Sequence, residues 1–205
     1  MTTGVPIVYL VDDDDAVRDS LSLLMKSVGL DSQEFASAAD FLAGYQPDQL
    51  GCLVLDIRMP GMSGLELQTE LHRQRSTLPI IFISAHGDIP MAVAAVRKGA
   101  TDFIQKPFDD EQLVAKIRDA LSGSFRRHEE ELERLEIRRR SATLTARETE
   151  VMSQVVQGKA NKVIASDLGV SQRTVEIHRA RVMEKMRAAS LAQLVRMVLI
   201  AEADI

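Results

Sequence analysis

The stretch GCLVLDIRMPGMSG, residues 51–64, contains the pattern that decides the fold of the first half of the chain. It begins with Gly51–Leu55, a run dense in valine and leucine that has no polar alternation. A short continuous run of this kind is typical of a strand buried on both faces, as in a parallel sheet. The run ends at Asp56. Further on, Ser63 with Glu66 has the spacing of a capping box, which predicts a helix over 63–73.

The same alternation of strand and helix patterns extends outward on both sides of this stretch. Pro6–Val11 and Pro79–Ile83 are further apolar runs, and weaker strand patterns lie near 32–35 and at 102–104. Helix patterns separate them, the clearest at Ala16–Ser27. Five repeats of strand and helix, ending near Leu121, predict a doubly wound α/β domain with a flavodoxin-like, five-stranded parallel sheet.

The last 60 residues contain helix patterns and no strand pattern. Thr145 with Glu148 forms a second capping-box spacing, and Gly169 has the position of a helix C-cap. We expect helices over about 145–158, 160–168, 171–186 and 191–201. The tight turn between the second and third of these predicts a helix-turn-helix within an all-α domain.

A long charged helix is expected between the two domains, from Phe108 to about Arg140. Its apolar positions step by four and three residues, which is the spacing of a coiled coil. These positions are Leu121, Phe125, His128, Leu132 and Leu135. The sequence leaves two interpretations open, a solvated connecting helix and a dimer seam. We therefore divide the chain into residues 1–121, a helical linker 122–141 and a C-terminal domain 142–205.

Composition and charge narrow the classes of protein. A single cysteine, Cys52, excludes an intrachain disulfide framework and a zinc site with several cysteines. No apolar run approaches the length of a membrane span, and residues 1–6 lack a secretory pattern, so we expect a cytoplasmic protein. Residues 1–120 carry ten Lys and Arg against eighteen Asp and Glu, whereas residues 141–205 carry nine against seven. This asymmetry suits a cation partner for the first part and a polyanion for the second.

Polar residues follow several of the predicted strands. Asp12 and Asp13 follow the first strand, Asp56 the third, Ser84 the fourth and Lys106 the fifth. The carboxyl ends of parallel strands meet at one edge of a sheet, so these side chains are expected to converge. Three adjacent carboxylates repel one another and need a cation, and their hard oxygen atoms favour Mg²⁺. The neighbouring Asp14 and Asp15 are interpreted as a helix cap or solvated residues.

These residues and their spacing resemble the receiver domain of two-component response regulators over residues 5–121. The matching motifs are V-D-D at 11–13, D-x-R-M-P-G-M-S-G at 56–64, Ser84-Ala85 and K-P-F at 106–108. The stretch A-H-G-D-I-P-M-A-V at 85–93 and the type of C-terminal domain indicate the FixJ-type group. The resemblance implies a CheY-like fold and Mg²⁺ as the cofactor. One departure is Ser84, where the group often has threonine; serine keeps the hydroxyl but lacks the methyl group.

The resemblance also implies a role for each matching residue. Asp56 is the expected phosphoacceptor, and Asp12, Asp13, Asp56 and the Arg58 backbone carbonyl are the expected metal ligands. Ser84 and Lys106 are expected to hold the phosphoryl group, Phe103 to be the switch aromatic, and Lys106–Pro107 to be a cis peptide. His86 is interpreted as a loop residue beside this site.

The tail resembles the NarL/LuxR type of four-helix DNA-binding domain over residues 142–203. The matching stretches are L-T-A-R-E-T-E-V from Leu144 and N-K-V-I-A-S-D-L-G-V-S-Q-R-T-V-E-I-H-R-A-R-V-M-E-K-M to Met186. The family places the third helix of this domain in the major groove. The side chains expected to contact DNA phosphates are Lys162, Arg173, Thr174, Arg179, Arg181 and Lys185. Those expected to face base edges are Glu176, Ile177 and Ala180, while Val175, Val182 and Met186 form an inward stripe. A lone His178 is interpreted as structural.

Together the two resemblances imply a transcriptional regulator that a sensor histidine kinase phosphorylates on Asp56. They also imply a homodimer, when phosphorylated, through residues 89–98 and 102–104, bound to double-stranded DNA and to no membrane. A rival from another class is an aspartate-nucleophile phosphatase, but such enzymes carry a second carboxylate where this chain has Arg58. A third interpretation, DNA binding whatever the phosphorylation state, is disfavoured by the complete set of Asp12, Asp13, Asp56 and Lys106.

Overall fold

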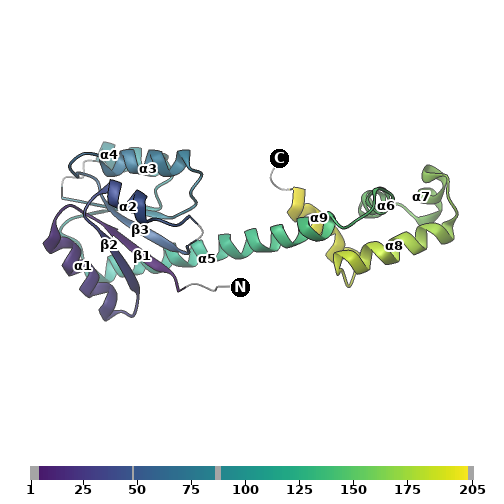
Figure 1. Ribbon diagram of the computed structural model, residues 1–205, viewed down its shortest axis with the longest axis horizontal. Helices are drawn as coiled ribbons and strands as arrows, with labels where there is room; N and C mark the ends of the chain where they lie inside the picture. Colours follow the sequence, from purple (N-terminus) through teal and green to yellow (C-terminus); the bar gives the residue numbers. More distant parts are fainter. Residues whose placement is uncertain (1–4, 48, 86–88, 203–205) are drawn as a thin grey trace. The chain divides into compact units, whose positions relative to one another are not determined.

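The computed structural model describes residues 5–47, 49–85 and 89–202. Its internal contacts divide the chain into two compact units, one reaching to His128 and the other beginning at Glu129. Figure 1 shows the elements in chain order. The first unit contains β1 (Ile7–Val11), α1 (Asp15–Ser27), β2 (Asp31–Phe35), α2 (Ala38–Gly44), β3 (Gly51–Asp56), α3 (Gly64–Arg73), β4 (Ile80–Ser84), α4 (Ile89–Arg97) and β5 (Asp102–Gln105). The helix α5 (Asp110–Ser141) crosses the division, and α6 (Ala146–Val156), α7 (Asn161–Leu168), α8 (Gln172–Met186) and α9 (Leu191–Glu202) follow.

The first unit is a parallel five-stranded sheet with the strand order β2-β1-β3-β4-β5, which confirms the predicted fold class. Every residue of β3 and β4 is buried, as expected for strands covered on both faces. One core cluster joins the sheet to α2, α3 and α4, and a second joins its other face to α1 and α5 (Figure 1). Since β1 and β3 are neighbours, the residues that follow them lie side by side.

The loop after β3 returns tightly against the end of that strand. The backbone N–H of Gly64 donates to the carbonyl of Ile57 at 3.0 Å. A Cβ atom on Gly64 would lie 2.2 Å from the backbone oxygen of Asp56, so only glycine fits here. Ser63, directly before Gly64, and Glu66, two residues after it, form both hydrogen bonds of the predicted capping box. Close backbone packing therefore holds the end of β3, where Asp56 lies.

The second unit is all helical, and the last turns of α5 belong to its core. Ile137 on α5 is only 2% exposed and packs in the same cluster as Val151, Val175 and Leu194. The predicted long helix is confirmed, although it begins at Asp110 and not at Phe108. The side chain of Asp109 accepts hydrogen bonds from two backbone N–H groups of the first turn, which places the helix start after it.

The other helices of this unit agree with the sequence prediction. Thr145 and Glu148 form the expected capping box at the start of α6, and Gly169 ends α7 in the left-handed conformation, with φ 64°. In the part of the chain that the structure describes, no helix combines the length and apolarity of a bilayer span.

The contact at Gly64 gives a first testable prediction. Gly64→Ala should destabilise the first unit by roughly 1–3 kcal/mol, because the added methyl group must displace backbone atoms of β3. Gly123→Ala is the matched control: it lies within α5, its Cβ would meet only an Arg127 side-chain atom at 3.5 Å, and it should stabilise by about 0.5–1 kcal/mol. Urea unfolding measures both. A Gly64→Ala midpoint equal to that of the wild type would contradict the close packing.

Candidate functional site

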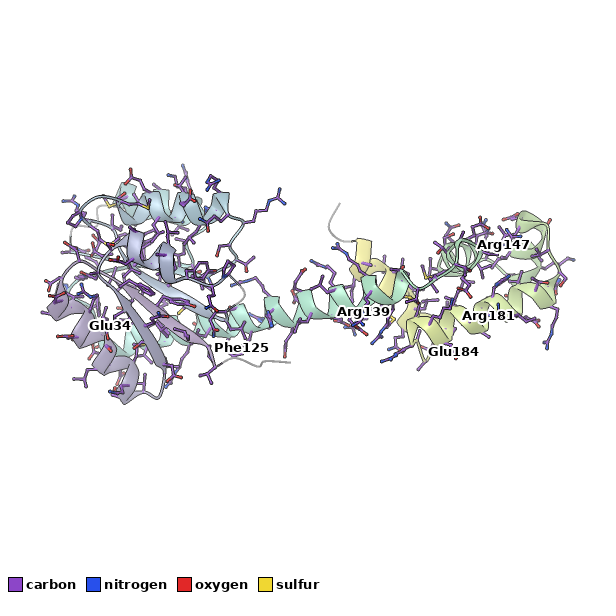
Figure 2. The ribbon with its side chains drawn as sticks, viewed as in Figure 1. Glu34, Phe125, Arg139, Arg147, Arg181 and Glu184 are labelled. Atoms are coloured by element: carbon purple, nitrogen blue, oxygen red, sulfur yellow. The ribbon has the colours of Figure 1, made fainter. Side chains whose placement is uncertain are left out.

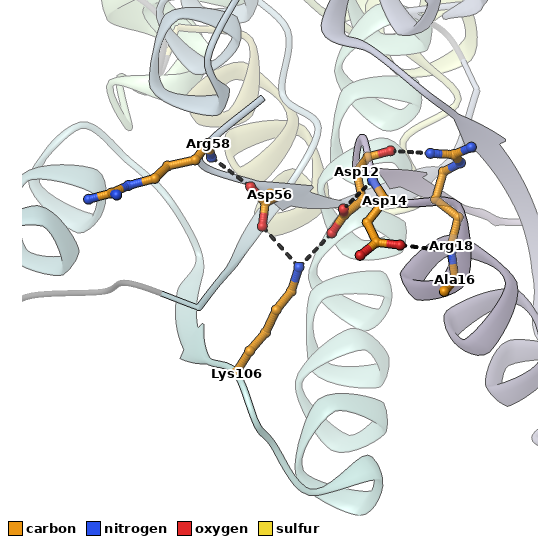
Figure 3. A network of polar contacts seen from close by, with 7 residues as sticks. All are labelled: Asp12, Asp14, Ala16, Arg18, Asp56, Arg58 and Lys106. Carbon is orange, nitrogen blue, oxygen red and sulfur yellow. Dashed lines mark hydrogen bonds and ion pairs between the residues drawn. The ribbon is translucent and has the colours of Figure 1, made fainter. Parts of the chain in front are cut away.

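The polar residues at the carboxyl ends of the strands form one cluster. The Lys106 ammonium donates to Asp12 Oδ2 at 2.6 Å and to Asp56 Oδ1 at 2.9 Å (Figure 3). Asp12 is 2% exposed and Asp56 is 7% exposed, so both carboxylates lie below the surface. The sequence-predicted convergence of these three side chains is thus observed.

Backbone N–H groups hold the two carboxylates in place, and one arginine holds the backbone of Asp12. Asp56 Oδ2 accepts the backbone N–H of Arg58 at 2.6 Å, and Asp12 Oδ1 accepts that of Asp14 at 3.0 Å. Asp14 also caps α1, as one of the alternatives for this residue predicted. Arg18, on the first turns of α1, donates to the backbone carbonyl of Asp12 at 2.6 Å (Figure 3). Arg18 was not predicted as part of this site, because an arginine in a helix gives no signal of its partner.

The charges of the cluster affect one another. Burial raises the pKa of Asp56 above its usual value, and the nearby Asp12 adds to this effect. The hydrogen bonds from Lys106 and from the Arg58 backbone act in the opposite direction without cancelling it. Burial alone would lower the pKa of Lys106, but its hydrogen bonds to Asp12 and Asp56 raise it. Lys106 is therefore the cation that makes two buried carboxylates compatible.

The donor atoms of this cluster fit a hard divalent cation. Asp12 and Asp56 offer carboxylate oxygens from adjacent strand ends, and Asp13, the residue after Asp12, is exposed. Oxygen ligands with room for water are those that Mg²⁺ prefers. Across residues 5–47, 49–85 and 89–202, no three His, Cys, Asp or Glu side chains are already gathered as a metal cage. The positive charge between the two buried carboxylates comes from Lys106.

The remaining predicted residues of this site lie on β4 and around β5. Ser84 is 1% exposed, and its backbone carbonyl accepts the N–H of Lys106 at 2.8 Å, which ties β4 to the residue that carries the ammonium. Phe103 is half-buried against the core beside α4. The Lys106–Pro107 peptide is cis, as predicted. His86 lies outside the described residues.

The second unit presents α8 after the turn that follows α7. Ser171 caps α8 by accepting the backbone N–H of Thr174 at 3.1 Å. The predicted inward stripe is confirmed, because Val175, Val182 and Met186 are buried. The other face is open to solvent, and Figure 2 labels Arg181 and Glu184 along it. The exposed residues of this helix that were predicted to contact DNA are Arg173, Glu176, Ile177, Ala180 and Arg181.

Two basic residues of α8 that were predicted to contact DNA bind residues outside this helix, and a third, Arg173, pairs with Glu176 on α8 itself at 3.2 Å. Lys185 donates to Glu148 at 2.5 Å and to the Thr143 carbonyl at 3.1 Å. The hydrogen bond from Lys185 is the main cause that lowers the pKa of Glu148 to about 2, followed by the backbone N–H of Thr145. Arg179 donates to Asn161 at 2.9 Å and so joins α8 to the start of α7.

Lys162, on α7, is exposed, and Thr174 is half-buried at the start of α8. His178 on α8 is half-buried. Its Nδ1 atom has no hydrogen-bond partner within the described ranges. The structural role interpreted for His178 stays a prediction.

Comparisons with known proteins identify both units. The response regulator receiver domain model matches residues 8–118, and the model of bacterial regulatory proteins of the luxR family matches residues 142–198. These two matches define a receiver domain followed by a LuxR-type DNA-binding domain. The chain therefore belongs to the response regulator family, and it is a FixJ-like transcriptional regulator.

Individual relatives cover nearly the whole chain. The transcriptional regulatory protein FixJ of Azorhizobium caulinodans is 50% identical over 201 residues, which are 98% of this chain and 95% of that protein. Nodulation protein W of Bradyrhizobium diazoefficiens is 47% identical over 191 residues, 93% of this chain and 84% of that protein. The solved structure of the response regulator StyR has a TM-score of 0.87 at 42% identity and covers 95% of this chain and 98% of its own.

The raised pKa of Asp56 predicts a pH-dependent stability. Ionising this carboxyl costs more in the folded chain than in the unfolded chain, so its contribution to stability is greatest below the ordinary pKa of 3.8. That contribution is lost as the pH rises through the folded-state pKa. In Mg²⁺-free buffer, Asp56→Asn should therefore unfold at a higher urea concentration than the wild type at pH 7.5, and the difference should shrink as the pH falls.

Asp13→Asn is the control for this comparison, since it removes an exposed carboxylate from the same edge of the sheet, after the neighbouring strand β1. We expect it to change the midpoint less than Asp56→Asn does. An Asp56→Asn chain that is less stable than the wild type at pH 7.5 would contradict the electrostatic account.

Proposed function

We propose that phosphoryl transfer from a sensor histidine kinase onto Asp56 controls the binding of α8 to double-stranded DNA. The family comparison implies both a histidine kinase partner and DNA binding. The observation that supports Asp56 as the acceptor is the Lys106 ammonium, which joins Asp56 to Asp12 in a buried cluster. A carboxylate in this position faces a cation that is able to bind a phosphoryl oxygen.

The transfer needs a nucleophile and compensation of negative charge. A carboxylate oxygen of Asp56 forms the new bond to phosphorus, and the bond from phosphorus to the imidazole nitrogen of the kinase breaks. Receiver domains typically bind Mg²⁺, which would supply charge neutralisation and orientation when bound. We propose Asp12, Asp13, Asp56 and the Arg58 backbone carbonyl as its ligands. Lys106 then moves its hydrogen bonds from the two carboxylates to the phosphoryl oxygens.

The phosphoryl group carries close to two negative charges, and these replace the single charge of the Asp56 carboxylate at the end of β3. We propose that Lys106 and the Ser84 hydroxyl turn toward this charge and that Phe103 turns inward beside Ser84. Such a change biases a two-state element of the receiver. The face formed by residues 89–98 and 102–104 would then support a homodimer. These steps extend the family's general properties to named residues of this chain.

For DNA, we propose that Glu176, Ile177 and Ala180 face base edges in the major groove. Ile177, an exposed apolar residue that is 44% accessible, suits contact with a thymine methyl group. The proposed phosphate contacts are Lys162, Arg173, Thr174, Arg179 and Arg181. Lys185, whose ammonium is engaged by Glu148, is left out of this set. These roles place the regulator in the cytoplasm, where its kinase and DNA are accessible.

The rival function is that of an aspartate-nucleophile phosphatase, which needs a second carboxylate two residues after the nucleophile. Two residues after Asp56 the chain has Arg58 and no carboxylate. The side chain of Arg58 extends away from Asp56, and only its backbone N–H reaches that carboxylate (Figure 3). No general acid is therefore available there for rapid turnover. We propose slow self-dephosphorylation and no further enzymatic activity.

DNA binding with and without acetyl phosphate tests the proposed function. In Mg²⁺, acetyl phosphate should strengthen binding of the wild-type chain to a duplex that this chain selects from a random pool. Asp56→Asn should show the same basal binding and no response, because an amide does not act as the nucleophile. Fluorescence anisotropy measures both. If Asp56→Asn responds like the wild type, the phosphoacceptor assignment is wrong.

Two exposed leucines on α5, which we call the exposed stripe, give a further prediction. Leu132 and Leu135 are 52% and 51% exposed, and helical spacing places them opposite Glu133 and Ile137, whose side chains contact α9 or the core. If the stripe is a seam in the phosphorylated dimer, Leu132→Glu with Leu135→Glu should weaken phosphorylation-dependent DNA binding and leave phosphorylation of Asp56 intact.

Replacing both leucines by glutamine is the control, since it removes the apolar groups without adding charge. If the glutamate pair and the glutamine pair both weaken DNA binding, the result supports a dimer seam. Weakening by the glutamate pair alone indicates repulsion from DNA, and unchanged binding by both pairs indicates a solvated connecting helix.

A further inference from the structure

Arg187, at the end of α8, has an unfavourable backbone conformation. It is the C-cap of this helix, with φ 53° and ψ 40°, in the left-handed region. Glycine adopts this region without the steric conflict that a Cβ atom causes, and it is the usual residue at such a position. Gly169 does so at the end of α7 in the same unit. An arginine at this position therefore costs the fold some stability.

The side chain of Arg187 is not needed to end the helix. The backbone N–H of Arg187 donates to Glu184 O at 3.0 Å, and that of Ala188 donates to Met183 O at 2.9 Å. The carbonyl of Met186 accepts from the Arg140 side chain at 3.3 Å. Any residue in this conformation would make these backbone bonds. The guanidinium is exposed, and among the residues that the structure describes it has no ion pair or hydrogen bond.

Lys185, unlike Arg187, has hydrogen-bond partners for its charged group. Its ammonium is directed inward to the buried carboxylate of Glu148 and to the carbonyl of Thr143. Withdrawing it to bind a phosphate would leave Glu148 buried without its cation, which is costly. The positive charge that is available at this end of α8 is therefore that of Arg187.

The distance along α8 from the predicted base-reading residues to Arg187 fits a contact of Arg187 with the DNA backbone. Arg187 continues the exposed series Arg173, Ile177, Ala180 and Glu184, which recurs at intervals of four and three residues. From Ile177 to Arg187 the chain advances about 15 Å at the helical rise. The major groove is about 12 Å wide, so a residue that far from the base-reading positions reaches the phosphates at its edge.

We propose that Arg187 contacts a DNA phosphate at the edge of the groove, and that Lys185 is a positioning residue that holds α8 against α6 through Glu148. This inference rests on the proposed DNA binding by α8. The recognised ligand is the phosphodiester backbone, without regard to base sequence. Glycine at position 187 would relieve the backbone strain, and it would remove the charge that contacts the phosphate.

Arg187→Gly separates the effect of this residue on stability from its effect on DNA affinity, because the variant should gain stability and lose affinity. The variant should unfold at a higher temperature than the wild type, since the left-handed residue is then unstrained. Its affinity for the selected duplex should fall roughly fivefold to tenfold at 0.1 M salt, with a salt slope lower by about one counter-ion. Arg75→Gly is the matched control: Arg75 is also exposed, also follows a helix and has φ 57°, but it lies in the receiver unit. It should gain stability and keep wild-type affinity and slope.

Lys185→Met tests the positioning role. It should lower the unfolding temperature, leave the salt slope unchanged and alter the ranking of base-substituted duplexes at a temperature where the chain stays folded. Lys185→Arg, which keeps an ion pair with Glu148, should restore the ranking. A slope reduced by Lys185→Met and unchanged by Arg187→Gly would overturn the assignment of both residues. If the wild type itself selects no duplex, the proposed function fails, and that outcome is distinct from a wild type that binds equally well without Arg187.

Discussion

The ammonium group of Lys106, between the carboxylates of Asp12 and Asp56, is the interaction on which the receiver domain depends. Two buried carboxylates on adjacent strands repel each other, and one lysine on the loop after β5 compensates both. The compensation is incomplete, since burial still keeps the pKa of Asp56 raised. The cluster is thus prepared for additional positive charge and for a phosphoryl group with which Lys106 would form new hydrogen bonds.

Much of this site could be predicted from the sequence, for a physical reason. The strands β1, β3 and β4 are continuous apolar runs, and Asp12, Asp56 and Ser84 lie where these runs stop. Lys106 follows the shorter and weaker run of β5. Parallel topology then brings strand ends to one edge of the sheet. The same reasoning works at helix starts, where Ser63 and Thr145 form the capping boxes that their spacing indicates. Local rules with a fixed geometry are readable from a single sequence.

Contacts between distant side chains could not be read in this way. Arg18 binds the Asp12 carbonyl, and Lys185 binds Glu148, 37 residues away, yet both are ordinary charged residues of amphipathic helices in the sequence. The left-handed conformation of Arg187 was equally hidden, because arginine carries no preference for it. Sequence spacing shows which face a residue occupies, whereas the choice of partner depends on how the helices pack. This is why the sequence predicted α8 and its inward face but not the partners of its basic residues.

The central claim is that Asp56 accepts the phosphoryl group, and chemical trapping tests it most directly. An aspartyl phosphate is an acyl phosphate, so borohydride reduction converts the modified residue to homoserine. The full chain, incubated with acetyl phosphate and Mg²⁺ and then reduced, is digested and sequenced by tandem mass spectrometry. The account predicts homoserine at position 56 and at no other aspartate, with the signal lost when Mg²⁺ is chelated. Homoserine at Asp12 or Asp13 in place of Asp56, or an unmodified Asp56 in a chain whose DNA binding responds to acetyl phosphate, would contradict it.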